Sequence, residues 1–116
     1  MEDEIAKQYT NDEEIKEIVK LIKGKRIIRT EHFFIRIYQR DVEEEFIDEI
    51  LPQFEKVKLI DKRKHKKGDI GYDLYYELSN SRTLKLCFIL KGNKVLLVNA
   101  ILRLRRWQSH LRLRRK

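Results

Sequence analysis

Hydrophobic residues in the first part of the chain recur at helical spacing. Asn11 is a suitable N-cap, Glu14 stands three residues later as in a capping box, and Gly24 is typical of a helix end. The apolar positions between them are Ile15, Ile18, Val19 and Ile22. Because these positions fall at i, i+3, i+4 and i+7, the sequence predicts a helix that packs one apolar face on the rest of the domain.

The following segment predicts two more helices. Thr30 can cap a second helix. The apolar residues of that helix are Phe33, Phe34, Ile37 and Tyr38. Asp41 and Glu44 repeat the capping-box spacing, so a third helix is predicted to start near Val42. Pro52 lacks a backbone donor and is expected to end this helix.

From residue 57 onward, hydrophobic and polar residues alternate, which is typical of β-strands. Turn-forming residues at 80–81 and 91–93 separate the runs. The alternating residues are Val57, Leu59, Tyr72, Leu74, Tyr76, Leu78, Leu84, Leu86, Phe88 and Leu90, followed by the run 94–104. We therefore expect an α+β fold in which N-terminal helices pack on a four-stranded antiparallel β-meander. A basic C-terminal helix or arm would follow the sheet.

The chain of 116 residues is long enough for a single domain with a small continuous core. We expect an N-terminal helix within 1–24, an α+β core over 30–104 and a basic tail at 105–116. The single cysteine, Cys87, cannot form an internal disulfide and favours a reducing compartment, so a cytoplasmic location is expected. Apolar runs are too short to span a membrane, and no membrane association is expected.

Charge divides the chain into an acidic and a basic half. Residues 1–60 carry 15 acidic and 11 basic residues, a net charge of −4, whereas residues 61–116 carry 4 and 16, a net charge of +12. Such an imbalance favours a polyanionic partner, either RNA or DNA or an acidic protein. The expected nucleic-acid contacts are Lys62, Arg63, Lys64, Lys66 and Lys67 in a basic turn, and Arg105, Arg106 and Arg112 in the tail.

The sequence motif with the most specific spacing is His32, Arg36 and Arg40 on the second predicted helix. Steps of four residues place the three side chains along one helix face. Guanidinium groups can bind a phosphodiester and stabilise its transition state, while an imidazole can act as a general acid or base. The alternative is a solvated polar face on which Arg36 and Arg40 pair with nearby glutamates.

This order of elements resembles the RelE-like and BrnT-like families of small microbial toxins, over roughly residues 30–104. By resemblance, His32, Arg36 and Arg40 match the signature helix of that group, in which helices pack on a four-stranded antiparallel sheet. Many members are metal-independent ribonucleases that are silenced by an antitoxin. Catalytic residues late in the sheet are common there, and Arg103, with His110 in the tail, is the counterpart by position. Asn99 shares strand parity with Arg103, so both are expected on one sheet face.

Three functional hypotheses stay open at this point. The protein is a metal-independent endoribonuclease, a non-catalytic nucleic-acid-binding module, or a module that docks an acidic, antitoxin-like protein. No metal site or cofactor is expected, because carboxylates and histidines form no ligand motif. His65 lies among lysines and is interpreted as a phosphate-contacting loop residue or a solvated turn, and Cys87 as a buried small hydrophobe. The oligomeric state stays open, because Phe33, Phe34 and Trp107 can either cover the sheet or form an interface between subunits.

Overall fold

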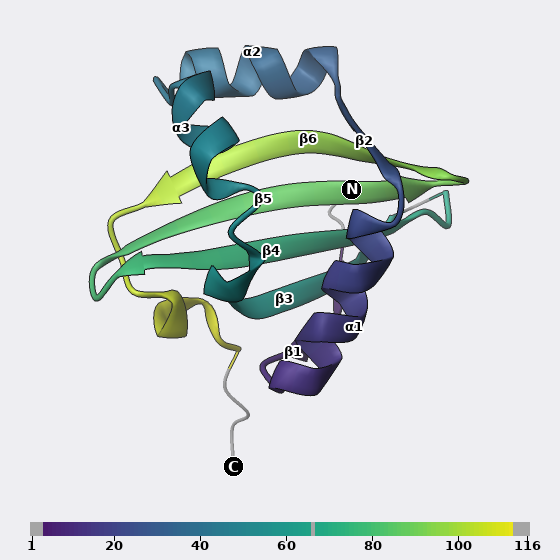
Figure 1. Ribbon diagram of the computed structural model, residues 1–116, viewed down its shortest axis with the longest axis horizontal. Helices are drawn as coiled ribbons and strands as arrows, with labels where there is room; N and C mark the ends of the chain where they lie inside the picture. Colours follow the sequence, from purple (N-terminus) through teal and green to yellow (C-terminus); the bar gives the residue numbers. More distant parts are fainter. Residues whose placement is uncertain (1–3, 66, 113–116) are drawn as a thin grey trace.

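The computed structural model describes residues 4–65 and 67–112 and contains one six-stranded mixed sheet (Figure 1). The strands are β1 (Glu4–Tyr9), β2 (Arg26–Arg29), β3 (Val57–Lys64), β4 (Ile70–Ser79), β5 (Arg82–Lys91) and β6 (Lys94–Arg103). Their order across the sheet is β1-β3-β4-β5-β6-β2. Strand β2 runs parallel to β6, and all other neighbours are antiparallel.

The α+β class is confirmed, but the predicted four-stranded antiparallel meander is wrong. Strands β3 to β6 do form a meander, to which β1 adds at the β3 edge and β2 at the β6 edge. Each edge of a bare meander would leave backbone N–H and C=O groups unpaired, and the two short strands satisfy part of them. Strand β1, which was not predicted, therefore precedes the expected N-terminal helix.

Three helices connect these strands: α1 (Asp12–Lys23), α2 (Glu31–Gln39) and α3 (Glu44–Ile50). The predicted caps of the first two are confirmed. Asn11 accepts hydrogen bonds from the backbone N–H groups of Glu13 and Glu14, at 2.9 and 3.1 Å, and Thr30 accepts one from Phe33 at 3.1 Å. Helix α1 ends at Gly24, as predicted. These local signals therefore identify both helix starts correctly.

Asp41 does not cap the third helix as expected. Its φ angle is 58°, in the left-handed region, and its N–H donates to the Tyr38 carbonyl at 3.2 Å. Aspartate tolerates this conformation better than most residues, so it reverses the chain after α2. Helix α3 begins later, with Glu43 as its N-cap residue, and is over before Pro52.

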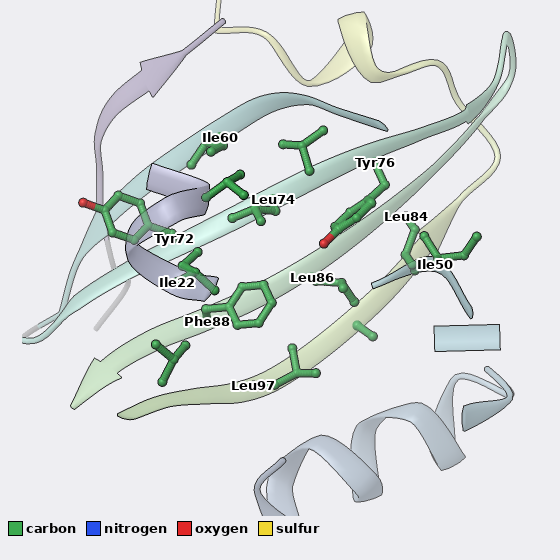
Figure 2. Packing of buried hydrophobic residues seen from close by; sticks show 14 of the residues in the cluster. Ile22, Ile50, Ile60, Tyr72, Leu74, Tyr76, Leu84, Leu86, Phe88 and Leu97 are labelled. Atoms are coloured by element: carbon green, nitrogen blue, oxygen red, sulfur yellow. The ribbon is translucent and has the colours of Figure 1, made fainter. Parts of the chain in front are cut away.

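Helices α1 and α3 cover one face of the sheet, and α2 lies along β6 beyond the end of β2 (Figure 1). The Thr30 N–H donates to the Leu97 carbonyl at 3.2 Å, which joins the start of α2 to β6. Figure 2 shows the buried residues of this face. They include Ile22 and Ile50 from the helices and Ile60, Tyr72, Leu74, Tyr76, Leu84, Leu86, Phe88 and Leu97 from the sheet.

The opposite sheet face carries charged and polar side chains, and we call it the polar face. Alternation along the strands requires this, because Asp73 and Lys85 each precede a leucine of the core. Cys87 pairs with Asn99 whereas Phe88 pairs with Leu97, so Val98 is the extra residue of a β-bulge. The bulge keeps Asn99 on the polar face.

The C-terminal segment returns to this polar face. The expected helix or extended arm is replaced by a short 3-10 turn, η2 (Trp107–His110), which follows β6. The His110 ring packs on Tyr75 with 4.8 Å between the ring centroids. Residues 113–116 lie outside the described part of the chain. No helix within 4–65 and 67–112 has the length and hydrophobicity needed to cross a membrane.

Candidate functional site

The polar face contains a hollow of about 260 Å³, which we call the histidine hollow. Its polar lining comprises His32, Arg63, His65, Asp73, Lys85 and Asn99. His32 comes from α2, His65 from the turn after β3, and the others from four adjacent strands. Two imidazoles and two cationic side chains thus gather at one depression, although they are far apart in the sequence.

A buried carboxylate holds the two cations of the histidine hollow. The side chain of Asp73 is only 4% exposed; it bonds Arg63 Nε through Oδ2, and Lys85 Nζ lies 3.6 Å from the same oxygen. Burial alone would lower the pKa of Arg63, but the bond and the charge of Asp73 prevail and raise it. A buried charge is tolerable only when it is paired, and this cluster keeps one positive charge in excess.

The predicted row on α2 forms, and two of its members contact protein groups. Arg36 Nε donates to His32 Nε2 at 3.1 Å, and Arg40 Nη1 donates to Asn99 Oδ1 at 2.8 Å. Because arginine can only donate, Nε2 of His32 is the acceptor of this hydrogen bond. The row therefore lies on the side of α2 that faces the hollow.

The glutamate pairing considered for this row is not seen within the described ranges. Glu44 instead accepts a hydrogen bond from Arg29 Nη1 at 2.8 Å, and Asp48 lies 2.6 Å from the other terminal nitrogen of Arg29. Two carboxylates of α3, those of Glu44 and Asp48, are thus engaged by Arg29 of β2. Arg36 and Arg40 are left to contact groups beside the histidine hollow.

His65 lines the histidine hollow, although its place among lysines predicts only a phosphate-contacting loop or a solvated turn. Its backbone N–H donates to the Asp69 carbonyl and its carbonyl accepts from Gly68, both at 2.9 Å, so the turn is hydrogen-bonded. Its imidazole lies against Gly71, where a Cβ atom would approach Nε2 to 2.7 Å. A glycine within a strand often marks such a close approach, and Gly71 was the signal available in the sequence.

Of the two residues predicted late in the sheet, Asn99 lines the histidine hollow and Arg103 does not. Asn99 and Arg103 pair with Cys87 and Thr83, so they share the polar face as expected, but Arg103 is exposed beyond the hollow. It lines another depression together with Arg40. His32, Arg36 and Arg40 are therefore close to the hollow, whereas Arg103 is at its periphery.

The predicted nucleic-acid contacts comprise one half-buried arginine, which is paired with a buried carboxylate, and a set of more exposed cations. Arg63 is held by Asp73, while Lys62 and Lys64 are residues of β3 and not of a loop. Lys66 lies outside the described residues. The cations exposed to solvent are Lys64, Lys67, Arg105, Arg106 and Arg112.

Cys87 also lines the histidine hollow and is half-buried. Burial, followed by the negative charge of Asp73, raises the pKa of its thiol well above the usual range. A thiol that stays protonated is a poor nucleophile and a poor metal ligand. Among the described residues, no three histidine, cysteine, aspartate or glutamate side chains come together in a group that could hold a metal ion.

Comparison with known proteins gives no further guide to this site. No protein-family model, curated protein or solved structure matches the chain. The resemblance to RelE-like and BrnT-like toxins therefore stays a prediction that depends on the quoted residues. The function has to be argued from the geometry of the polar face.

Proposed function

We propose that this protein binds RNA on its polar face and cleaves it in the histidine hollow without a metal ion. The observation that carries the proposal is the presence of two imidazoles, His32 and His65, around one hollow that also contains Arg63 and Lys85. Cleavage of RNA by its own 2′-hydroxyl needs a base, an acid and positive charge near the phosphate. The hollow offers a side chain for each role.

His32 is the proposed general base. Its Nε2 accepts a hydrogen bond from Arg36, and the 2′-hydroxyl of the substrate would replace Arg36 as the donor. His32 then takes the hydroxyl proton while the 2′-oxygen forms a bond to the adjacent phosphorus. The bond from phosphorus to the 5′-oxygen breaks, and a protonated His65 gives its proton to that oxygen. The products are a 2′,3′-cyclic phosphate and a 5′-hydroxyl.

Lys85 and Arg63 supply the positive charge in this mechanism. Both are held by the buried Asp73 of β4, which fixes Arg63 on β3 and Lys85 on β5 before the substrate arrives. Cations held in a partly dehydrated hollow stabilise a developing phosphorane better than mobile surface lysines do. The reaction is proposed to take place in the cytoplasm, the compartment that the single cysteine favours.

Cleavage of a structured RNA in the presence of EDTA tests this proposal. We expect the unmodified protein to cut, and His32→Ala to lose on the order of a hundredfold or more in rate, because general base catalysis contributes about that much. Gln39→Ala is the matched control, since Gln39 is exposed on the same helix and lines no part of the hollow. Equal rates for His32→Ala and the unmodified protein would remove His32 from the mechanism.

A non-catalytic RNA-binding or DNA-binding module is the second candidate. The observation that favours it is that both arginines of the row already donate hydrogen bonds within the protein, Arg36 to His32 and Arg40 to Asn99. Binding requires only the exposed cations around the hollow. If the unmodified protein and His32→Ala both bind RNA in a salt-sensitive way and leave it intact after long incubation, this alternative is established and the ribonuclease is excluded.

A further inference from the structure

A second hollow adjoins the first on the polar face and has a volume of about 490 Å³. We call it the C-terminal hollow. Arg63 and Lys85 line both hollows, so the two depressions meet at these side chains. The other polar lining comprises Asp61, Tyr75, Ser109, His110 and Arg112. None of these five residues is used in the proposed cleavage step.

The walls of the C-terminal hollow are fixed by a single side chain from β1. Gln8 Nε2 donates to Asp61 Oδ1 at 2.7 Å and to the His110 carbonyl at 3.1 Å, and Gln8 Oε1 accepts from the Arg112 N–H at 2.8 Å. The Tyr75 hydroxyl donates to the other oxygen of Asp61, also at 2.8 Å. The C-terminal segment is thus fastened to the sheet, and the hollow exists before any ligand binds.

The C-terminal hollow is suited to an anion. Asp73 already pairs with Arg63 and Lys85, and Asp61, which is 1% exposed, already accepts two hydrogen bonds. With Arg112 the three cations still exceed these two carboxylates by one charge. The Nε2 atom of His110 is buried and has no hydrogen-bond partner among the described residues. A buried nitrogen without a partner is costly, and a polar group of a ligand would satisfy it once the His110 ring turns toward the hollow that it lines.

The spacing of the two hollows matches successive groups on an RNA strand. Asp73 and Cys87, which pair across β4 and β5, line the histidine hollow, whereas Tyr75 and Lys85, the next pair on the same face, line the C-terminal hollow. One such step along a strand is about 6.6 Å. A phosphodiester linkage can span this distance, and it would pass over Lys85.

We propose that the C-terminal hollow binds the nucleotide next to the scissile phosphate, so that the substrate is a single strand of RNA with at least two consecutive phosphates. This inference rests on the proposed function of the histidine hollow. Single strands are required because a nucleotide can enter a hollow only when it is not stacked and paired within a duplex. Lys85 and Arg63 then contact the strand between the two hollows.

The test compares two probes that cannot be cleaved, a 2′-O-methyl trinucleotide and a 2′-O-methyl mononucleotide with one phosphate. We expect the trinucleotide to bind about tenfold tighter or better, since an added hydrogen bond to a charged group and an added phosphate contact each contribute on that scale. The His110 ring signals in NMR spectra should shift with the trinucleotide and not with the mononucleotide.

Two variants test the hollow itself. His110→Phe keeps a ring on Tyr75 but removes Nε2, and Arg112→Gln removes a charge while its backbone N–H can still donate to Gln8. Each is expected to reduce the advantage of the trinucleotide to about threefold or less. Unfolding curves show whether each variant folds, and if one does not, the other supplies the comparison. The ratio of the affinities for the two probes and the His110 shifts are measured on the unmodified protein alone.

Equal affinity of the unmodified protein for both probes would overturn this inference and leave the ribonuclease proposal intact. If folded His110→Phe or Arg112→Gln keeps the full preference for the trinucleotide, the inference is likewise overturned and the ribonuclease proposal stays intact. If neither probe binds and RNA is not cleaved, both proposals fail together. Trinucleotide preference without any cleavage would support the C-terminal hollow as a binding site and contradict only the catalytic part.

Discussion

At the residue scale, the place of His65 depends on the absence of a side chain at Gly71. A Cβ atom at Gly71 would lie 2.7 Å from His65 Nε2 and 3.2 Å from the Phe88 carbonyl oxygen. The imidazole is the more mobile of these neighbours, so it would be the group that moves. Gly71 therefore leaves open the space that the His65 imidazole occupies.

We predict that Gly71→Ala slows RNA cleavage by about tenfold or more, because a misplaced acid loses part of its contribution to catalysis. Its free energy of unfolding should fall by only about 1–3 kcal/mol, as expected for local overpacking. Cleavage rates and urea unfolding curves measure both effects. Gly24→Ala is the matched control, because the nearest atom to its Cβ is 3.4 Å away and belongs to α1. Unchanged cleavage by Gly71→Ala would contradict the role of His65.

At the scale of elements, the C-terminal turn η2 is held against the sheet by His110 and Gln8. Burial, followed by the positive charges of Arg103, Lys85 and Arg105, lowers the pKa of His110, and only Asp61 acts in the opposite direction. The unfolded chain therefore binds a proton at higher pH than the folded chain does. It follows that the folded state loses stability as pH falls through the usual histidine range near 6.5.

We predict that the free energy of unfolding decreases between pH 7.5 and pH 5.5, and that His110→Phe shows a smaller decrease. Trp107 is the single tryptophan of the chain and lies within η2, so its fluorescence reports on this turn. Urea unfolding at the two pH values, followed by Trp107 emission, measures the effect. The same pH dependence in His110→Phe would show that another group is responsible.

Short-range signals in the sequence predicted the elements that depend on local chemistry. Asn11, Thr30 and Gly24 mark helix ends through their own hydrogen bonds or backbone preferences, and the structure confirms them. Strands β1 and β2 were missed because they are short and owe their pairing to exposed edges of the meander, which no local pattern encodes. Asp41 was misassigned because the same residue type serves as an N-cap and as a left-handed turn residue.

The candidate site was only partly predictable, because local patterns place residues within one element but not across the sheet. Spacing on a helix placed His32, Arg36 and Arg40 on one face, and strand parity placed Asn99 with Arg103. That His32 and His65 line the same hollow depends on the order of strands across the sheet, which no local sequence pattern encodes.

At the scale of the whole molecule, the two faces of the sheet have different roles. One is covered by α1 and α3 and holds the core, while the other carries the charge cluster, both hollows and the C-terminal turn. Exposed cations such as Lys67, in the turn between β3 and β4, and Arg105, after β6, follow from the positive charge of the second half of the chain. Long-range attraction would draw a polyanion to this face.

We predict that RNA affinity falls steeply with salt and that Lys67→Gln and Arg105→Gln each reduce the log-log slope by about 0.7, the value for one lost contact to a single strand. Lys20→Gln is the matched control, because it removes the same charge from α1 on the covered side. Binding isotherms over a range of salt concentrations give the slopes. A slope altered equally by all three variants would mean that only total charge matters.

The most direct test of the central claim is mass spectrometry of a defined RNA after incubation with the protein in EDTA, alongside the His32→Ala/His65→Ala double variant. The mechanism predicts fragments that end in a 2′,3′-cyclic phosphate with the unmodified protein and intact RNA with the folded double variant. The same fragments from both proteins, or intact RNA from both, would contradict a metal-independent ribonuclease in the histidine hollow.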